Sequence, residues 1–408
     1  MYNIFEVFMN ILLAVSGSIA AYKSPDICRG LVNQGHKVKV VLSKGSLEFV
    51  NKNVFNYLGA EDTFIYSDDF NHKGILHIEL SNWLDRFVLA PASANTISKL
   101  SQGQCDDLTS SIFLSLDQNK EKIIFPAMNT KMLSNPITQE NLNRIKKNPN
   151  TFIVESESGL LACGEVGNGK LPDVREIVDL IPMLSSLKNN KKVIVTAGAT
   201  LSNLDPVRFV TNPAKGGSAY LIARKYLSKG YKVHVIKGQN CVDSFKYLTK
   251  HPLYSEETVS TTQDLLDAVK AKNHDFDLYI SPMAVSDVEF DYQDSKIKKS
   301  SMNGSLSYKH APDVLKYVLE NKKADQIIVG FAAETDLEDT TIYEKMKRKP
   351  VDLLVANLVN SGFNKKEKMG FGTNIGTYKL VSKTSTENYL HLPKEELAEI
   401  IFKKTENL

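Results

Sequence analysis

Cysteine is scarce in this chain of 408 residues, and the four that occur stand far apart without a Cys-x-x-Cys pair. They are Cys28, Cys105, Cys163 and Cys241. The spacing therefore predicts neither a disulfide framework nor a zinc ribbon. A reducing cytoplasm is the expected compartment, because structural disulfides belong to oxidising ones.

A strong net charge and long apolar runs are also missing. Lys and Arg total 50 against 47 Asp and Glu, and the resulting charge of +3 is too small to indicate nucleic acid or an anionic membrane as a partner. No apolar run approaches the ~20 residues of a membrane span. The N-terminus lacks a basic stretch and carries Glu6, so no signal peptide is expected. A local cluster of lysines would still suffice to bind a phosphorylated small substrate.

What the chain does contain is an alternation of short apolar, β-rich runs with amphipathic segments of helix length. Candidate strands in the first half are residues 11–15, 37–42, 86–90, 122–125 and 151–154, with helical patterns at 20–34, 93–115 and 130–146. After the polar stretch 187–192 the strands are 193–196, 232–236, 278–281, 326–329, 353–356 and 377–382, with a last helix near 393–404. Nearly all-apolar strands between helices predict parallel sheets covered on both faces. The expected fold is α/β with two doubly wound domains: a flavodoxin-like or Rossmann-like domain over 9–187 and a Rossmann-like domain over 191–408.

Two turns of small residues follow strands in the first half. Residues 16–23 (SGSIAAYK) join the first strand to a helix, and residues 90–96 (APASANT) end another strand. A strand, a turn and a helix start form an anion site, and ligands of open α/β sheets bind at the carboxyl ends of strands. The first turn is not a GxGxxG dinucleotide fingerprint, so a phosphate-binding turn and a ligand-free tight turn remain equally favoured.

Three polar residues of the first half are candidates for chemistry. His77 lies in residues 77–83 (HIELSNW), just before a strand, and a lone histidine there is more often structural than catalytic. Its spacing from His72 fits no metal pair. Asn129, in residues 126–129 (PAMN), also fits a helix N-cap. Cys163 lies in the glycine-dense segment 158–170, which indicates a loop, and an isolated thiol in a loop favours a chemical role.

These motifs, followed by residues 162–170 (ACGEVGNGK), occur in the order found in homo-oligomeric flavin-containing cysteine decarboxylases. Residues 9–180 resemble phosphopantothenoylcysteine decarboxylase, the first half of bifunctional coenzyme A biosynthesis enzymes. The resemblance implies FMN as the electron acceptor for the substrate thiol. It implies that Cys163 returns a proton to the product, that His77 lies beside flavin and substrate, and that Asn129 holds the substrate carboxylate. The other implied FMN contacts are Gly17, Ser18, Ile19, Ser43, Ala92, Ser93 and Asn95. Lys170 stands where that family usually has arginine.

The second half again places a glycine turn, residues 196–200 (TAGAT), after a strand, and a phosphate-binding turn and a plain turn are equally favoured. Taken alone, residues 296–299 (KIKK) indicate a solvated surface run. Lys345 and Lys349 are four residues apart on an expected helix and share one face. Like charges so placed favour an anion between them, and a triphosphate would supply it.

Residues 190–400 resemble phosphopantothenate–cysteine ligase, the second half of the same bifunctional enzymes. The matching stretches are residues 205–209 (DPVRF) with Asn212, 284–287 (AVSD), 296–299, 330–335 (GFAAET) and 347–349 (KRK) before 353–357 (LLVAN). The resemblance implies that CTP activates 4′-phosphopantothenate as an acyl-cytidylate, which the amine of cysteine attacks, with Mg2+ held through the CTP phosphates rather than by a protein motif. It implies that Lys296 stabilises the charge that develops during activation and that Asn212 stabilises the acyl-cytidylate. It also implies that Arg208 orients the substrate. The other implied CTP contacts are Asp287, Pro312, Asp313, Phe331, Lys345 and Lys349.

The chain departs from the ligase family at two points: Ala199 replaces a usual second glycine, and Pro213 with Ala214 replaces two serines after Asn212. The sequence therefore predicts a cytoplasmic bifunctional enzyme that makes 4′-phosphopantetheine, with trimeric flavin domains and dimeric ligase domains. One alternative is a flavin-dependent decarboxylase whose ligase domain is weakened or inactive. Another is a non-catalytic flavin-binding regulatory protein, against which Cys163 together with Asn129 argues.

Overall fold

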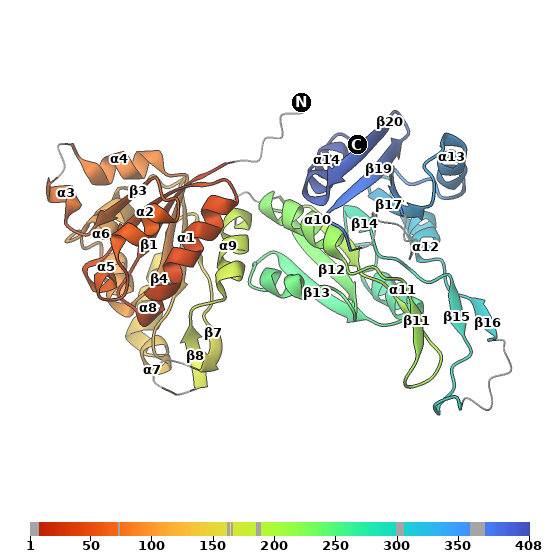
Figure 1. Cartoon of the computed structure of the whole chain (residues 1–408), viewed down its shortest axis with the longest axis horizontal. Coiled ribbons are helices and arrows are strands. Elements are labelled where there is room, and N and C mark those ends of the chain that lie inside the picture. The colour runs from red at the N-terminus through yellow and green to blue at the C-terminus, as the bar shows by residue number, and fades with distance from the viewer. Residues whose placement is uncertain are drawn as a thin grey trace. The chain divides into compact units, whose positions relative to one another are not determined.

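The computed structural model describes residues 8–71, 74–160, 164, 166–184, 189–298, 306–359 and 372–408. The chain divides into two compact units, Met1–Ser186 and Leu187–Leu408 (Figure 1). Each unit has its own sheet and its own cluster of buried apolar side chains. The fold that the alternating pattern predicts is therefore built twice in this chain.

The main sheet of the first unit is parallel, with the strand order β3-β2-β1-β4-β5-β6. The strands are β1 (Asn10–Val15), β2 (Lys37–Leu42), β3 (Asp62–Ile65), β4 (Arg86–Ala92), β5 (Glu121–Pro126) and β6 (Thr151–Ile153). This is the order of a doubly wound nucleotide-binding fold, and the winding direction reverses between β1 and β4. A crevice for a ligand is expected at the carboxyl ends of these two strands.

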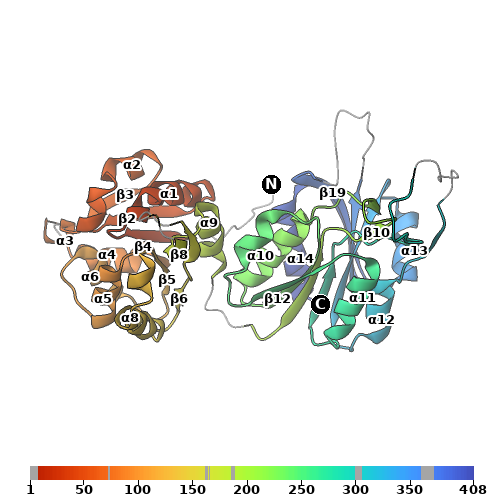
Figure 2. The ribbon, with the colours of Figure 1, turned by 90° about the horizontal axis from the view of Figure 1, so that it is seen from below.

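Helices cover both faces of this sheet, with α1, α2 and α9 on one side and α4, α5, α6 and α8 on the other (Figure 2). The helices are α1 (Ser24–Asn33), α2 (Lys52–Tyr57), α3 (Asp68–Asn71), α4 (Leu76–Trp83), α5 (Ala94–Gln102), α6 (Leu108–Ser115), α7 (Thr130–Leu133), α8 (Pro136–Lys146) and α9 (Val174–Met183). Short 3-10 helices, η1 (Ile19–Lys23) and η2 (Lys44–Glu48), follow β1 and β2. The burial of β4 along its whole length explains why its sequence is apolar without alternation.

Several expectations for the first unit need correction. The helical pattern 93–115 is two helices, because Gly103 ends α5 in the left-handed region at φ 71° and the Asp107 side chain caps α6. Asn135 and Pro136 likewise separate α7 from α8. His77 lies on helix α4, which the sequence did not predict, and this helix directly precedes strand β4 as expected. The glycine-dense segment expected as a loop includes an antiparallel hairpin, β7 (Glu157–Leu160) and β8 (Val166–Lys170).

In the second unit the sheet order is β13-β12-β9-β14-β17-β18-β19-β20. The strands are β9 (Lys192–Ala197), β12 (Lys232–Gly238), β13 (Tyr254–Val259), β14 (Leu278–Ser281), β17 (Ile327–Glu334), β18 (Leu353–Leu358), β19 (Ile375–Ser382) and β20 (Thr386–Pro393). From β13 to β18 the pairing is parallel and repeats the winding order of the first unit. Strands β19 and β20 pair antiparallel, so the expectation of a purely parallel sheet is wrong at this edge.

Helices also lie on both faces of the second sheet, with α10 and α14 together on one face and α11 and α12 on the other (Figure 2). The helices are α10 (Gly217–Ser228), α11 (Thr262–Ala271), α12 (Val314–Asn321), α13 (Asp339–Arg348) and α14 (Lys394–Glu406), with a 3-10 helix η3 (Asp243–Leu248). Two small hairpins extend from the carboxyl edge: β10 (Leu201–Asn203) with β11 (Phe209–Thr211), and β15 (Val288–Phe290) with β16 (Tyr308–His310).

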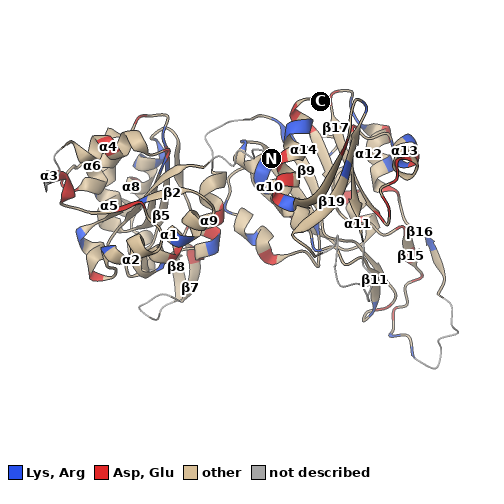
Figure 3. Ribbon diagram, turned by 45° about the horizontal axis from the view of Figure 1, so that its top comes forward, with Lys and Arg blue, Asp and Glu red and all other residues tan. Residues whose placement is uncertain are grey.

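Charged residues of both signs occur along the same helices, for example α13 and α14 (Figure 3). This interspersion agrees with the small net charge. Within the described residues, no helix has the length and apolar character needed to cross a membrane.

Candidate functional site

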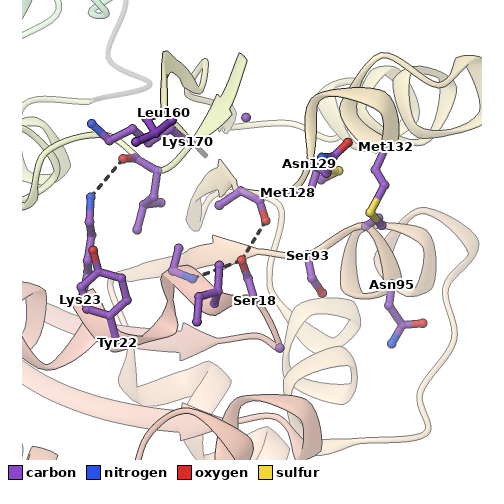
Figure 4. Close-up of a pocket in the computed structure, with 17 residues that line it drawn as sticks. Ser18, Tyr22, Lys23, Ser93, Asn95, Met128, Asn129, Met132, Leu160 and Lys170 are labelled. Atoms are coloured by element: carbon purple, nitrogen blue, oxygen red, sulfur yellow. Dashed lines mark hydrogen bonds between the residues drawn. The ribbon is translucent and has the colours of Figure 1, made fainter. Parts of the chain in front are cut away.

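A cavity of about 620 Å3 lies in the first unit at the carboxyl ends of β1, β4 and β5 (Figure 4). Three turns contribute to it, one after each of these strands, and the hairpin β7–β8 adds a further wall. The lining residues are Gly17, Ser18, Ile19, Ala20, Tyr22, Lys23, Ser93, Ala94, Asn95, Ala127, Met128, Asn129, Met132, Leu160, Gly169, Lys170 and Leu171. The cavity therefore occupies the crevice that the reversal between β1 and β4 predicts.

The first two turns are joined by the buried hydroxyl of Ser16. Its Oγ donates to the Pro91 carbonyl at 2.8 Å and accepts from the Ser93 amide at 2.7 Å. Ser18 caps the 3-10 helix η1, and its Oγ donates to the Ala127 carbonyl at 3.0 Å, which links the first turn to the third (Figure 4). The small residues of the SGSIAAYK and APASANT motifs thus hold three strand ends together around one space.

Gly17 allows an especially close approach of two backbones. A Cβ atom on Gly17 would lie 2.9 Å from the Cα of Gly45, in the turn that follows β2. Real Cβ atoms do not approach backbone atoms so closely, so a side chain at position 17 would force the two turns apart. In this turn after β2, Ser43 caps the helix η2 by accepting from the Ser46 amide at 3.2 Å.

The third turn is fastened to the hairpin β7–β8. The Met128 amide donates to the Gly169 carbonyl at 3.0 Å, and Thr130 Oγ1 donates to the Asn168 carbonyl at 2.6 Å. Gly169 has a φ of 126°, and a Cβ atom there would lie 2.1 Å from the Met128 oxygen, so this contact requires glycine. The PAMN and GNGK motifs therefore meet although they lie about 40 residues apart.

Asn129 is also a helix cap, because its Oδ1 accepts from the Lys131 amide at 2.8 Å. This bond fixes the orientation of the side-chain amide at the wall of the cavity.

Two lysines give one side of the cavity a positive character. Lys23 Nζ donates to the Leu171 carbonyl at 3.4 Å (Figure 4). Lys170 Nζ lies 3.8 Å from a carboxylate oxygen of Glu157. Burial lowers the pKa of Lys23, and the nearby charge of Lys170 lowers it further. Two ammonium groups that repel each other at a cavity wall are stabilised when an anion binds there.

The remaining first-unit candidates lie elsewhere. His77 does not line the cavity; its Nδ1 is 2.7 Å from Asp69 Oδ2, and its backbone amide donates to Asp69 Oδ1 at 3.1 Å. Ala92 is buried at the end of β4, where its carbonyl accepts from the Ala127 amide. Cys163 lies outside the described residues.

In the second unit the glycine turn follows β9, at the strand pair β9–β14 where the winding reverses. Gly198 takes the left-handed conformation, with φ 81°, whereas Ala199 does not. Ala199 is buried, and its neighbours Gly198 and Thr200 exchange backbone hydrogen bonds with Ala284 at 2.9 and 3.2 Å. Only one residue of this turn needs to be glycine, so the turn accommodates the alanine that replaces the second glycine of the family.

Asn212 is exposed directly after β11, and Lys296 is exposed in the segment after β15. The guanidinium of Arg208 does not extend freely toward a substrate: Nε and Nη2 donate to Asp205 Oδ2 at 2.9 and 2.6 Å, and Nη2 also donates to the Ile297 carbonyl at 2.6 Å. The structure thereby brings the DPVRF motif against the KIKK motif.

The CTP candidates form a second group at the ends of β14 and β17. The carbonyl of exposed Asp287 accepts from the Ala311 amide at 3.0 Å, which places Asp287 beside Pro312 and Asp313. Asp313 caps α12 and pairs with Lys349 at 2.7 Å. Burial opposes ionisation of Asp313, but hydrogen bonds from Lys349 and the Lys316 amide outweigh it and lower the pKa of the carboxyl.

The lysine pair expected to share an anion is arranged differently. Lys345 pairs with Glu334 at the end of β17, the strand that carries half-buried Phe331, and Lys349 pairs with Asp313. Each lysine thus has its own carboxylate, because long-range neighbours supply charges that helical spacing does not reveal.

Sequence reasoning assigned no role to Tyr22, Lys23 and Met132, which line the cavity, or to Asp205 and Glu334 in the second unit. All of these residues except Met132 lie inside the motifs named in the sequence analysis, so membership of a motif could have indicated a role for them. Across the described ranges, no group of three or more His, Cys, Asp or Glu side chains is arranged to hold a metal ion.

Comparison with known proteins assigns the family. A model of the Flavoprotein family matches residues 6–186, and a model described as the DNA/pantothenate metabolism flavoprotein C-terminal domain matches residues 188–408. The chain is 35% identical over 382 residues to the coenzyme A biosynthesis bifunctional protein CoaBC of Bacillus subtilis (strain 168), covering 90% of this chain and 89% of the relative. The chain belongs to the CoaBC family.

Two solved structures are each similar to less than half of this CoaBC-family chain. A PPC decarboxylase mutant complexed with pantothenoylaminoethenethiol is 34% identical, covers 43% of this chain and 96% of its own, and has a TM-score of 0.39. The FMN-binding protein AtHal3 is 33% identical, covers 45% of this chain and 99% of its own, and has a TM-score of 0.40.

Proposed function

We propose that this CoaBC-family chain catalyses two steps of coenzyme A biosynthesis. Its second unit joins 4′-phosphopantothenate to cysteine at the expense of CTP, and its first unit decarboxylates the product, phosphopantothenoylcysteine, to 4′-phosphopantetheine. The observation that supports this most is the convergence of three motif-bearing turns on one cavity at the winding reversal of the first sheet.

The residues around this cavity fit FMN. Its volume, about 620 Å3, is in the range of cofactor sites. Ala94 and Asn95, the first residues of α5, line it, and the free amides of a helix N-terminus suit a phosphate. Gly17 keeps the wall free of a side chain, while Met128, Met132 and Leu160 offer apolar contacts for a ring system.

Bound FMN would supply an electron acceptor for the thiol of the substrate, which makes loss of CO2 from the neighbouring carbon possible. The chain's own residues would bind and orient the substrate. Oδ1 of Asn129 is engaged with Lys131, so we assign its Nδ2 as the donor to the substrate carboxylate. Lys23 and Lys170 provide the positive wall for the substrate's phosphate, Lys170 without the bidentate fork of arginine. We assign Cys163 to the return of a proton to the product. His77 does not line the cavity of a single chain, so we assign it to a position beside substrate and flavin in the proposed trimer, where neighbouring subunits share the site.

In the second unit we assign Lys296 to the charge that develops on the α-phosphate of CTP and Asn212 to the acyl-cytidylate. Asp287, Pro312, Asp313, Phe331, Lys345 and Lys349 are the proposed CTP contacts. Breaking the pairs Lys345–Glu334 and Lys349–Asp313 would release ammonium groups to a triphosphate. We propose that Mg2+ binds through the CTP phosphates, since it retains oxygen ligands from water and substrate. A cytoplasmic homo-oligomer, with trimeric flavin units and dimeric ligase units, completes the proposal.

One variant separates the two activities. Lys296→Gln should reduce pyrophosphate release from CTP and 4′-phosphopantothenate by ~10²–10³-fold, the scale of removing one electrostatic donor. Decarboxylation of supplied phosphopantothenoylcysteine should not change, and the purified protein should keep a yellow flavin spectrum. A colourless protein that fails to bind added FMN would contradict the first-unit assignment. Absence of pyrophosphate release from the unmodified protein would show that the second unit is not a ligase.

A further inference from the structure

The carboxylate of Asp205 has an unusual environment in the second unit. Its side chain is 0% exposed and accepts five hydrogen bonds. Four come from the turn that Asp205 itself begins: the amides of Val207 and Arg208 at 2.8 and 2.9 Å, and the Arg208 guanidinium. The fifth comes from the Ile297 amide at 3.1 Å, 92 residues further along the chain.

Asp205 remains a carboxylate in this environment. Burial opposes its ionisation, but the hydrogen bonds from Arg208, Val207 and Ile297 outweigh burial and hold the pKa of the carboxyl well below its usual range. Hydrogen bonds to an ionised acceptor are about twice as strong as bonds between neutral groups. The bond to Ile297 is therefore a strong connection between two loops.

Both backbone groups of Ile297 are held. Its amide donates to Asp205, and its carbonyl accepts from Arg208 Nη2 at 2.6 Å. Earlier in the same segment, the Gln293 amide donates to the Leu204 carbonyl at 3.0 Å. The residue before Ile297 is Lys296, so this clamp fixes the backbone from which the Lys296 side chain extends.

Asp205 lies in the hairpin β10–β11, and this hairpin also contacts the segment around Asp287. Ser202 Oγ, on β10, donates to the Val288 carbonyl and lies 2.9 Å from Ser286 Oγ. Asp287 lies between these two residues. Hairpin β10–β11 thus holds the neighbours of two proposed nucleotide contacts, and Asn212 follows its second strand.

We propose that Asp205 is a positioning residue for the ligation reaction, which, together with Arg208, clamps Ile297 and thereby places Lys296 relative to the hairpin that leads to Asn212. The proposal rests on the ligase function proposed for this unit. Lysine has a long flexible stem, so the position of its charge depends on the backbone that carries it. A displacement of about 1 Å in such a group can lower the rate about 10²-fold.

Single-residue hydrogen exchange tests the clamp without CTP. In the unmodified protein the Ile297 amide should exchange more slowly than the amide of Lys296. Asp205→Asn should accelerate exchange at Ile297 by at least ~10-fold, the loss expected for a hydrogen bond to a charged group. Asp294→Asn, an exposed acid of the same segment, is the matched control and should leave that rate unchanged.

A double-mutant cycle tests the link to Lys296. Asp205→Asn should lower kcat for pyrophosphate release by about 10–100-fold, with normal flavin content and decarboxylation. In a Lys296→Gln background, Asp205→Asn should lower kcat by less than a further twofold. Both substitutions remove the same contribution, which is the correctly placed charge of Lys296. Multiplicative losses would mean that Asp205 supports the fold only, and fast Ile297 exchange in an active unmodified enzyme would mean that the clamp does not exist. An unmodified protein without pyrophosphate release would instead refute the proposed function, and the proposal with it.

Discussion

Adding one methyl group at Gly17 tests how the flavin cavity is built. A Cβ atom there would lie 2.9, 3.0 and 3.2 Å from the Cα, C and O atoms of Gly45. These are backbone atoms, so no side chain can rotate away to relieve the contact. Gly17 is not in the left-handed region, so Gly17→Ala adds a steric clash without backbone strain.

The expected cost of this overpacking is ~1–3 kcal/mol in the free energy of unfolding of the first unit. If the turn moves to relieve the clash, the same free energy is lost from FMN binding, which corresponds to a roughly 5- to 150-fold weaker Kd. The assay is flavin content after purification, followed by fluorescence titration of the flavin-free protein with FMN. Thermal unfolding of the same samples reports the stability cost.

Gly45→Ala is the matched control, because it approaches the same contact from the other side. Its Cβ atom would lie 3.1 Å from Gly17 Cα and 3.7 Å from Gly17 N, so a smaller loss of flavin affinity is expected. Pyrophosphate release should be normal in both variants. Wild-type flavin affinity and unfolding temperature in Gly17→Ala would refute the argument that this close approach shapes the cavity.

Three further outcomes are expected. Cys163→Ser should retain FMN and release CO2, but it should accumulate the oxidised enethiol product in single-turnover mass spectrometry, because a hydroxyl is far less acidic than a thiol; full turnover would exclude a role for Cys163 as acid. Asp69→Leu should change the nitrogen-15 NMR shifts of His77, whose Nδ1 lies 2.7 Å from Asp69, and lower decarboxylation by at least ~10-fold; unchanged shifts would show that Asp69 does not set the tautomer. The Asp205 carboxyl has a folded pKa below its unfolded value of ~3.9, so its stabilisation is complete well above that pH and is lost as the pH falls. The difference in unfolding temperature between wild type and Asp205→Asn should therefore be largest near pH 7 and shrink below about pH 4; a difference that grows in acid would contradict it.

The central strands could be predicted because they are buried on both faces and therefore apolar throughout. Strands β1, β4, β9 and β14 all begin and end within two residues of the predicted bounds. The edge strands β13 and β20 were missed, since one face of each is solvated and their sequences, YSEETV and TENYLHLP, mix polar with apolar residues. The edge formed by β19 and β20 is also where the expectation of a purely parallel sheet fails. The connection from β19 to β20 is a short hairpin and not a crossover, so these two strands run antiparallel.

The candidate site was predictable where a motif follows a strand. Gly17, Ser93 and Asn129 line one cavity because the winding order brings the ends of β1, β4 and β5 together. The partners of charged residues were not predictable. Glu334 neutralises Lys345 and Asp205 holds Ile297 through contacts between distant segments, and such pairings depend on the tertiary fold rather than on local spacing.

The hairpin β7–β8 has a consequence for the thermodynamics of binding. It is held to the third turn by protein groups alone, through hydrogen bonds from Met128 and Thr130 and through the close contact that requires residue 169 to lack a side chain. A ligand entering the cavity therefore meets a wall that is already ordered and does not have to supply the conformational entropy of assembling it. Ligand binding against the wall formed by β7 and β8 should therefore show a small unfavourable entropy and an association rate close to that of a preformed pocket.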